Sequence, residues 1–249
     1  MATTTQQRLS PHELQASIFD RVLVGIDGSP ASLDAATQAA ALATGPVTLL
    51  AAYQLTEAVV GAGMAPGPVY IDEAPIRERA EQALQSVARD LASVDVRQKI
   101  CSGRAWKALL EEIARERHTL VAVGSHGAGR AKGILMGSTA TELVHKAPCS
   151  VLVARTPLKK RFPGSIIVGV DGSKESLVAE AVARDLARRF DAPLDRYENV
   201  PDPVSSLVSA AMEVDLVVVG SRGLRGLRSL GSVSERVAHE AACSVLVVR

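Results

Sequence analysis

The sequence predicts an α/β protein of two tandem domains, each with a parallel, doubly wound sheet, the second domain being shortened. The first reason is repetition: Val22-Leu-Val-Gly-Ile-Asp-Gly-Ser29 returns as Ile166-Ile-Val-Gly-Val-Asp-Gly-Ser173, and Cys-Ser-Val-Leu-Val occurs at 149–153 and again at 243–247. The second reason is that short apolar runs alternate with segments of helical periodicity. This alternation indicates right-handed βαβ crossovers and a parallel sheet with helices on both faces.

The elements of the first domain can be justified in chain order. A continuous apolar run at Val22–Ile26 is typical of a strand covered on both faces. A helix at Ser32–Ala43 follows the Asp-Gly-Ser motif, and a strand at Val47–Tyr53 leads into a long Gly/Ala/Pro loop. Apolar residues then recur at helical spacing from Ile76 to Leu91, which predicts a helix with its charged residues outside. The rest of the domain is predicted as strand, helix, strand, helix and strand at Val94–Ile100, Trp106–Glu116, Leu120–Val123, Thr139–His145 and Ser150–Ala154.

The second copy is shorter than the first. Asp171 lies 144 positions after Asp27, but Gly220 lies only 96 positions after Gly124, so about 48 residues are missing between them. We expect the loss of a strand, the long loop and a helix, which leaves a sheet of four strands. The segment that remains predicts a strand at Leu194–Val200 and a helix through Val204–Ala211. The chain is thus divided into a polar arm at 1–20, a first domain at 21–155, a proline-bounded basic linker at 156–164 and a truncated second domain at 165–249.

Composition excludes several classes of function. The 249 residues are 47% hydrophobic and 22% charged, as in soluble globular proteins, and the 3% of aromatic residues leaves little for stacking single-stranded nucleic acid. A formal net charge of +1 gives no general attraction to nucleic acid or anionic lipid. The first twenty residues lack the apolar run of a signal peptide, and Glu57, Pro66 and Pro68 interrupt the apolar stretch at 49–69. We therefore expect a cytoplasmic protein with no nucleic-acid and no membrane partner. Three cysteines without metal-ligand spacing predict neither a disulfide framework nor a metal site.

Two motifs are expected to converge on one crevice. The first strand ends at Asp27 and the fourth at Gly124, and ligands of doubly wound sheets bind outside the carboxyl ends of the strands. The loop after the fourth strand contains Gly127 and leads to Gly137-Ser138-Thr139 at the start of a helix. Glycines let backbone N–H groups turn toward an anion, and a helix start adds further N–H groups and a positive dipole end. Nucleotide phosphates fit this description, with Arg130 and Lys132 as candidate neutralising charges.

Each feature also has a purely structural interpretation. A Gly-x-x-Gly sequence after a strand is often a turn, Gly-Ser-Thr before a helix is often a cap, and an aspartate at position 27 is also suited to capping the first helix. Against this stands the joint recurrence of the same features in the second copy. The residues concerned there are Asp171, Gly220, Gly223, Gly231 and Ser232.

These motifs resemble the universal stress protein family in its tandem form. The likeness rests on Asp-Gly-Ser after the first strand, on glycines spaced Gly-two-Gly-nine-Gly-Ser, and on the closing Ala-Pro-Cys-Ser-Val-Leu-Val, and it covers nearly all of the chain from residue 21. The resemblance implies Rossmann-like domains of the adenine nucleotide alpha hydrolase-like type, which bind ATP, with or without Mg²⁺, in the subgroup that carries this glycine pattern. Carried over to this chain, Asp27 lies near the nucleoside, Ala52 lines the adenine, Gly124 and Gly127 follow ribose and phosphate, and Gly137, Ser138 and Thr139 hold the phosphates. Gly25 and Arg130 complete the expected first site, and the second would comprise Asp171, Gly220, Gly223, Gly231, Ser232 and Val233.

The second copy departs from the family pattern in two ways. Only seven residues separate Gly223 from Gly231, and the missing segment overlaps the region where a second strand would line the adenine. Arg222, Arg225 and Arg228 are candidates for phosphate contacts or for a solvated basic loop. Whether the second domain binds ATP is left open by the sequence.

The sequence favours a binding protein over an enzyme. The Gly-Lys-Ser/Thr phosphate loop of ATPases is missing, no paired acid and base are visible, and His126 has no obvious partner to orient it as a base. We expect a regulatory, stress-response protein that binds ATP, with slow hydrolysis left open. One alternative is a ligand-free scaffold whose last strands, Ser150–Ala154 and Ser244–Arg249, pair between two chains as a homodimer or within one chain. Another is an ATP-consuming transferase with Gly61–Tyr70 as the lid of a substrate pocket.

Overall fold

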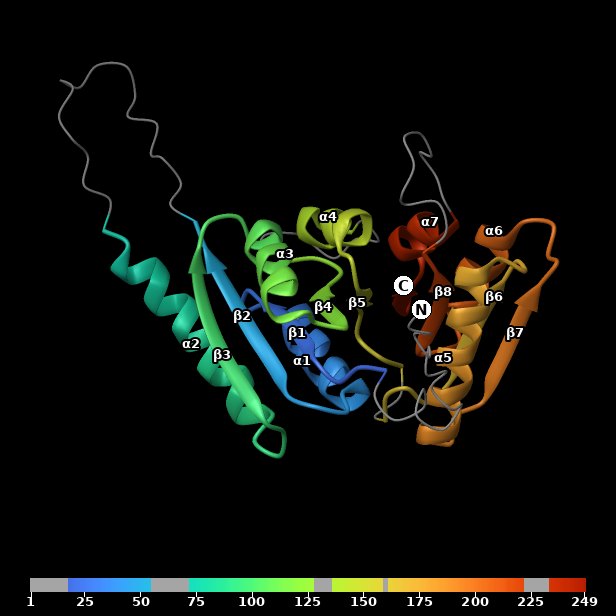
Figure 1. Cartoon of the computed structure of the whole chain (residues 1–249), viewed down its shortest axis with the longest axis horizontal. Coiled ribbons are helices and arrows are strands. Elements are labelled where there is room, and N and C mark those ends of the chain that lie inside the picture. Colours follow the sequence, from blue (N-terminus) through green and yellow to red (C-terminus); the bar gives the residue numbers. More distant parts are fainter. Residues whose placement is uncertain (1–17, 55–71, 128–135, 159–160, 222–232) are drawn as a thin grey trace, which may run out of the picture.

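The computed structural model describes residues 18–54, 72–127, 136–158, 161–221 and 233–249, which form one mixed sheet. Its strand order is β3-β2-β1-β4-β5-β9-β8-β6-β7 (Figure 1). The strands are β1 Val22–Ile26, β2 Val47–Tyr53, β3 Val96–Ser102, β4 Leu120–Gly124, β5 Ser150–Ala154, β6 Ile166–Val170, β7 Leu194–Glu198, β8 Leu216–Gly220 and β9 Ser244–Val248. The helices within these segments are α1 Pro30–Leu42, α2 Ala74–Asp90, α3 Ala105–Glu116, α4 Ser138–Lys146, α5 Lys174–Phe190, α6 Pro203–Ala210 and α7 Val233–Glu240.

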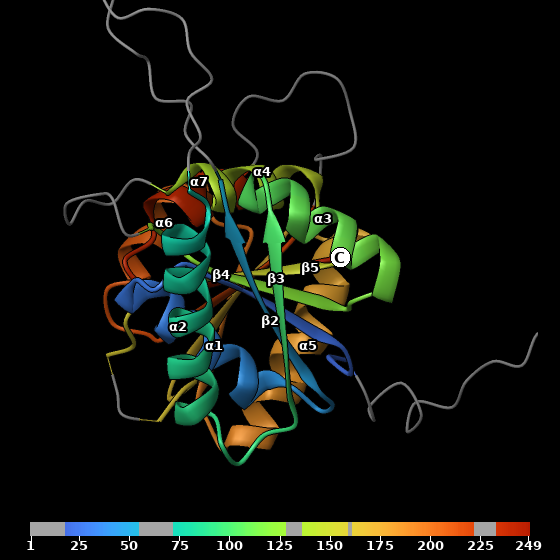
Figure 2. The same cartoon turned by 90° about the vertical axis from the view of Figure 1, so that its left-hand side faces the viewer.

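Helices cover both faces of the sheet, as the alternation of elements predicts. One core contains Ala35, Leu84 and Leu186 and lies under α1, α2 and α5. The other contains Leu109 and Leu143 and lies under α3, α4, α6 and α7. Figure 2 shows α2 lying along β2 and β3 at one end of the sheet. The fold is therefore a three-layer α/β/α arrangement whose two cores are separated by the apolar strands.

The two halves of the sheet are each parallel, and they join through one antiparallel pair. In this pair Val151, Leu152 and Val153 of β5 lie opposite Val247, Leu246 and Val245 of β9. Because β5 also pairs with β4 and β9 with β8, neither closing strand has an open edge. The sequence left open whether these strands pair within or between chains, and the structure pairs them within one chain. A homodimer through the same strands would require this pair to open.

The shortened half keeps four strands, as predicted, and the structure shows which strand it lacks. Strand β7 pairs with β6 as β2 pairs with β1: Ile166 lies opposite Leu194, as Val22 lies opposite Val47. The elements without a counterpart are α2 and β3, which form the outer end of the first half. The second half therefore retains a strand in the place where a ligand wall is expected.

An internal pseudo-twofold relates the contacts between the halves. Arg155, after β5, donates from its guanidinium to the carbonyl oxygens of Ala238 and Cys243 at 2.6 and 3.0 Å. Arg249, after β9, donates in the same way to the carbonyl oxygens of Val144 and Cys149. Each arginine thus caps the last turn of a helix in the opposite half, where carbonyl groups lack intrahelical partners. Burial lowers the pKa of Arg155 to about 10, so the side chain stays charged at neutral pH.

Three further sequence expectations concern the bounds of the strands, a membrane-spanning helix and the proposed lid. The predicted ranges for β1, β2 and β5 agree with the structure, whereas β3 begins and ends two residues later than predicted. Within the described segments, no helix combines the length and the apolar character needed to cross a bilayer. The proposed lid at Gly61–Tyr70 lies outside the described residues.

Candidate functional site

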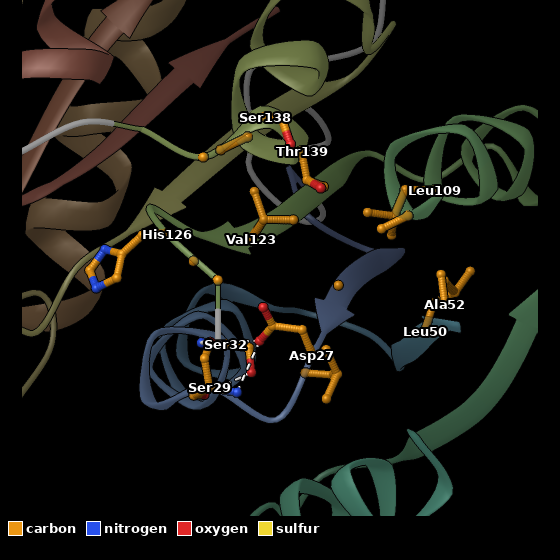
Figure 3. Close-up of a pocket in the computed structure, with 17 residues that line it drawn as sticks. Asp27, Ser29, Ser32, Leu50, Ala52, Leu109, Val123, His126, Ser138 and Thr139 are labelled. Atoms are coloured by element: carbon orange, nitrogen blue, oxygen red, sulfur yellow. Dashed lines mark hydrogen bonds between the residues drawn. The ribbon is translucent and has the colours of Figure 1, made fainter. Parts of the chain in front are cut away.

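A cavity of about 330 Å³ opens at the carboxyl ends of β1 and β4, where a ligand site is expected (Figure 3). It lies between the start of α1, the ends of β2 and β4, the start of α3 and the start of α4. One side is apolar and the other carries carboxylate, hydroxyl and backbone groups. The lining residues are Gly25, Ile26, Asp27, Ser29, Ser32, Leu50, Ala52, Ala105, Leu109, Val123, Gly124, His126, Gly127, Gly137, Ser138, Thr139 and Ala140. We call this cavity the first pocket.

Asp27 is held in place by a turn between β1 and α1. Gly28 has φ +78°, a left-handed conformation that favours glycine. The turn lets Asp27 Oδ1 accept hydrogen bonds from Ser29 N at 2.9 Å and Ser29 Oγ at 2.6 Å. Ser29 Oγ in turn accepts from Ser32 N at 3.2 Å and caps α1. The N-cap of α1 is thus Ser29, and Asp27 orients the capping residue while its own carboxylate lines the pocket.

Gly124 at the end of β4 and Gly127 in the following loop serve different purposes. A Cβ on Gly127 would lie 2.6 Å from Asp27 Oδ2, so the glycine motif and the aspartate motif meet directly. A Cβ on Gly124 would lie 2.7 Å from the Cβ and 2.8 Å from the backbone carbon of Ala31. Gly124 therefore allows α1 to pack closely on β4, a structural reason that the sequence motif alone does not reveal.

The apolar side of the first pocket is built from three elements. Leu50 and Ala52 come from β2, Leu109 from α3 and Val123 from β4. Gly25 lies beneath them: a Cβ there would approach Val123 Cγ1 to 3.0 Å and Leu109 Cδ1 to 3.1 Å. A flat, apolar ring would find contacts on several sides of this wall.

The polar side is formed by the N-terminus of α4. Gly137 is the N-cap residue with φ −70°, and no side chain among the described residues caps this helix. Its N–H donates to Ser125 O at 2.6 Å, which ties the helix start to the end of β4. The next N–H groups of α4 lie beside the hydroxyls of Ser138 and Thr139 at the pocket. An uncapped helix N-terminus with adjacent hydroxyls is a suitable partner for an anion.

His126 does not extend into the centre of this arrangement. Its Nδ1 lies 2.8 Å from Ser125 Oγ, so the ring does have an orienting partner that sequence reasoning missed. In Figure 3 the imidazole is turned away from Asp27 and Thr139. The position of the ring does not suit a base that acts on a group bound between those two residues.

A second cavity, of about 490 Å³, occupies the equivalent place in the second half. Asp171 repeats the turn of Asp27, since its Oδ1 accepts from Ser173 N at 3.0 Å and Ser173 Oγ at 2.5 Å. Tyr197 of β7 lies opposite Gly169, as Leu50 of β2 lies opposite Gly25. The wall that we expected to be lost is therefore rebuilt with an aromatic residue. Other residues lining this second pocket are Asn199, Val200, Pro203, Leu207, Val219, Gly220, Val233 and Ser234.

A model of the universal stress protein family matches residues 18–155 and 194–249. The chain belongs to the universal stress protein family. The first matched segment contains the strands and helices that build the first pocket, and the second contains β7, α6, β8 and α7, which supply part of the second pocket. The segment between them comprises the linker, β6 and all of α5.

Relatives of this universal stress protein extend over nearly the whole chain. A universal stress protein of Mycolicibacterium smegmatis is 30% identical over 290 aligned residues, which cover 92% of this chain and 96% of the relative. One from Mycobacterium tuberculosis is 29% identical over 288 residues with the same coverage. Among solved structures, a universal stress protein from Archaeoglobus fulgidus is similar with a TM-score of 0.71 and 19% identity, covering 94% of this chain and 98% of that one. The last likeness concerns the fold.

The structure brings together most of the residues that the family resemblance singled out. Eight of them line the first pocket: Gly25, Asp27, Ala52, Gly124, Gly127, Gly137, Ser138 and Thr139. Asp171, Gly220 and Val233 line the second pocket. Arg130, Gly223, Gly231 and Ser232 lie outside the described residues. Sequence reasoning missed Leu50, Leu109, Val123 and Tyr197, which are ordinary core-type residues in sequence and become wall residues only through strand pairing.

Proposed function

We propose that this universal stress protein binds ATP in the first pocket and acts as a regulatory protein in the cytoplasm, its occupancy changing an interaction with a partner. One observation carries the proposal: an apolar wall, a fixed carboxylate and a helix N-terminus that no side chain of the described residues caps lie around one cavity at the carboxyl ends of β1 and β4. These three features match the adenine, the ribose and the phosphates of one nucleotide. A simple anion such as phosphate or sulfate needs no apolar surface, so its binding would leave the apolar wall without a role.

Each part of the nucleotide has a partner in this proposal. The adenine packs among Leu50, Ala52, Leu109 and Val123, because these residues offer apolar surface on several sides. Asp27 accepts hydrogen bonds from the ribose hydroxyls. The phosphates lie at the start of α4, where N–H groups and hydroxyls donate to them.

Mg²⁺ would enter with the phosphates. Asp27 is the carboxylate that lines the first pocket, and within the described segments no group of three or more His, Cys, Asp or Glu side chains forms a metal site. Mg²⁺ is commonly held by one or two carboxylates together with phosphate oxygens and water. Because Asp27 is assigned to the ribose, the ion would be held in this pocket by phosphate oxygens and water, and it would add charge that keeps the phosphates in place.

We further propose that the second pocket takes a second, more weakly held nucleotide. Asp171 and Tyr197 preserve the carboxylate and the wall. Val233 stands where the first pocket has Thr139, so one hydroxyl that would donate to phosphate is replaced by a methyl group. No catalytic turnover forms part of the proposal for either pocket.

The test exchanges this one residue between the pockets. Nucleotide released from the purified protein is identified, and ATP binding is then titrated by calorimetry for the wild type, Thr139→Val and Val233→Thr. Loss of a hydrogen bond to a charged phosphate costs about 1.5–3 kcal/mol, so Thr139→Val should weaken the tighter site by roughly 10-fold to 100-fold. Val233→Thr should strengthen the weaker site and leave the tighter one unchanged.

The outcomes separate the two parts of the proposal. No uptake of ATP at millimolar concentration would refute nucleotide binding and favour the ligand-free scaffold. One ATP per chain, weakened by Thr139→Val and insensitive to Val233→Thr, would restrict the site to the first pocket. Gly127→Ala, whose added Cβ would displace the Asp27 carboxylate, is a second variant of the first pocket.

A further inference from the structure

A large apolar groove runs along α5. Its volume is about 1,220 Å³, and Leu177 and Val178 in it are 51% and 47% exposed. Cys149 at the start of β5 and Ile18 just before β1 close its other side. We call this the α5 groove. Exposed apolar side chains gathered in one concave surface indicate that something covers them.

The internal pseudo-twofold places the linker against α1 at the equivalent position. Thr156 Oγ1 donates to Asp34 Oδ2 at 2.8 Å, and Gln38 Nε2 donates to the carbonyl oxygen of Arg155 at 2.6 Å. Further along, Phe162 is 8% exposed and packs into the core beneath α1 and α5. The chain that precedes β6 therefore covers the face of α1 that corresponds to the α5 groove.

The positions of α1 that bind the linker are polar, whereas the equivalent positions of α5 are apolar. The repeat offset of 144 positions places Val178 at the position of Asp34 and Val182 at the position of Gln38, and both valines line the α5 groove. The α1 surface holds its covering chain by hydrogen bonds. The α5 surface offers apolar side chains in the same places, so its covering chain must be apolar there.

The same offset identifies the segment that should cover the α5 groove. Ile18 stands at the position of Phe162, so residues 12–17 precede β1 as residues 156–161 precede β6. This segment carries Leu14, which lies four residues before Ile18, a spacing that places both on one face of a helix, and Leu9 lies a little further toward the N-terminus. Extended chain spans about 3.3 Å per residue, and a helix such as the 17-residue α5 rises about 1.5 Å per residue, so residues 1–17 are long enough to follow the whole of α5.

We propose that residues 1–17 bind in the α5 groove of their own chain, with Leu14 against Val178 and its neighbours. The segment then covers the second half as the linker covers the first. This gives the polar arm a defined role as an intramolecular strap that shields an apolar face from other proteins.

Two cysteines related by the repeat provide the test. Cys149 lines the α5 groove, whereas its counterpart Cys243 lies against Arg155, where the linker begins. Alkylation rates of both are measured by mass spectrometry in the full chain and in a chain that begins at Ile18. Burial raises the pKa of Cys149 to about 11 and that of Cys243 to about 12. Removing the covering segment should make the Cys149 thiol more accessible and raise its alkylation rate by roughly tenfold, while the rate at Cys243 stays constant.

A milder variant guards against loss of folding. Leu14→Ser in the full chain should raise the rate at Cys149 in the same direction, and Thr4→Ser serves as the matched control. Equal rates at Cys149 in the full chain, the shortened chain and Leu14→Ser would overturn the proposal. So would protection that disappears on dilution, because the groove would then be covered by a second copy. A parallel rise at Cys243 would mean general unfolding and would also count against a local strap.

Discussion

Replacing Arg155 with methionine tests how the two halves are held together. Arg155 Nη2 and Nη1 donate to the carbonyl oxygens of Ala238 and Cys243 at 2.6 and 3.0 Å, and the substitution leaves both carbonyls without this charged donor. Hydrogen bonds from a charged group contribute about 1.5–3 kcal/mol each. Because methionine does not carry the desolvation cost of a buried guanidinium, we expect a net loss of about 2–4 kcal/mol in the free energy of unfolding.

Urea denaturation followed by circular dichroism measures this loss. A protein of this size loses about 2–4 °C of Tm per kcal/mol, so thermal unfolding should shift by roughly 10 °C in parallel. The control is Arg161→Met, which removes an exposed arginine from the linker and should change stability by less than about 0.5 kcal/mol. If Arg155→Met were no less stable than Arg161→Met, the Arg155 guanidinium would not be needed to join the halves, and the β5–β9 pair and the contacts of Arg249 would have to do so.

Two further variants test local packing and pH dependence. Gly124→Ala should destabilise the protein by about 1–3 kcal/mol because its Cβ would lie 2.8 Å from the backbone of α1. A Cβ on Gly137 would come no closer than 3.6 Å to any described neighbour, so Gly137→Ala should cost less than about 1 kcal/mol in the same denaturation assay. Burial lowers the pKa of His118, and Glu112 at 3.7 Å opposes this fall only in part. The unfolded chain therefore binds a proton near pH 6.5 that the native protein does not, so stability falls as pH drops through that value, by up to about 1.4 kcal/mol per pH unit. His118→Val, which introduces the residue found at the equivalent Val214, should flatten this slope in denaturation curves at pH 5–8, and an unchanged slope would assign the acid sensitivity to other groups.

The residues of the candidate site that directly follow strands were predictable from the sequence. Asp27 and Gly127 follow apolar runs that are recognisable in the sequence, and parallel strands of one sheet bring their carboxyl ends to one edge. The walls were less predictable, because Leu50, Leu109 and Tyr197 look like any other buried residue. Their contribution follows from the register of β2 and β7 against β1 and β6.

The sequence by itself determined the repeat, the order of strands and helices and the two turns at Asp27 and Asp171, because periodicity and turn chemistry are local properties of the chain. Tertiary structure decided that β5 and β9 pair within one chain, that α2 and β3 are the elements missing from the second half, and that Gly124 serves helix packing. These outcomes depend on contacts between residues up to about a hundred positions apart. Such contacts are selected by the burial of shared apolar surface and the satisfaction of backbone hydrogen bonds across the whole sheet, which no single segment encodes.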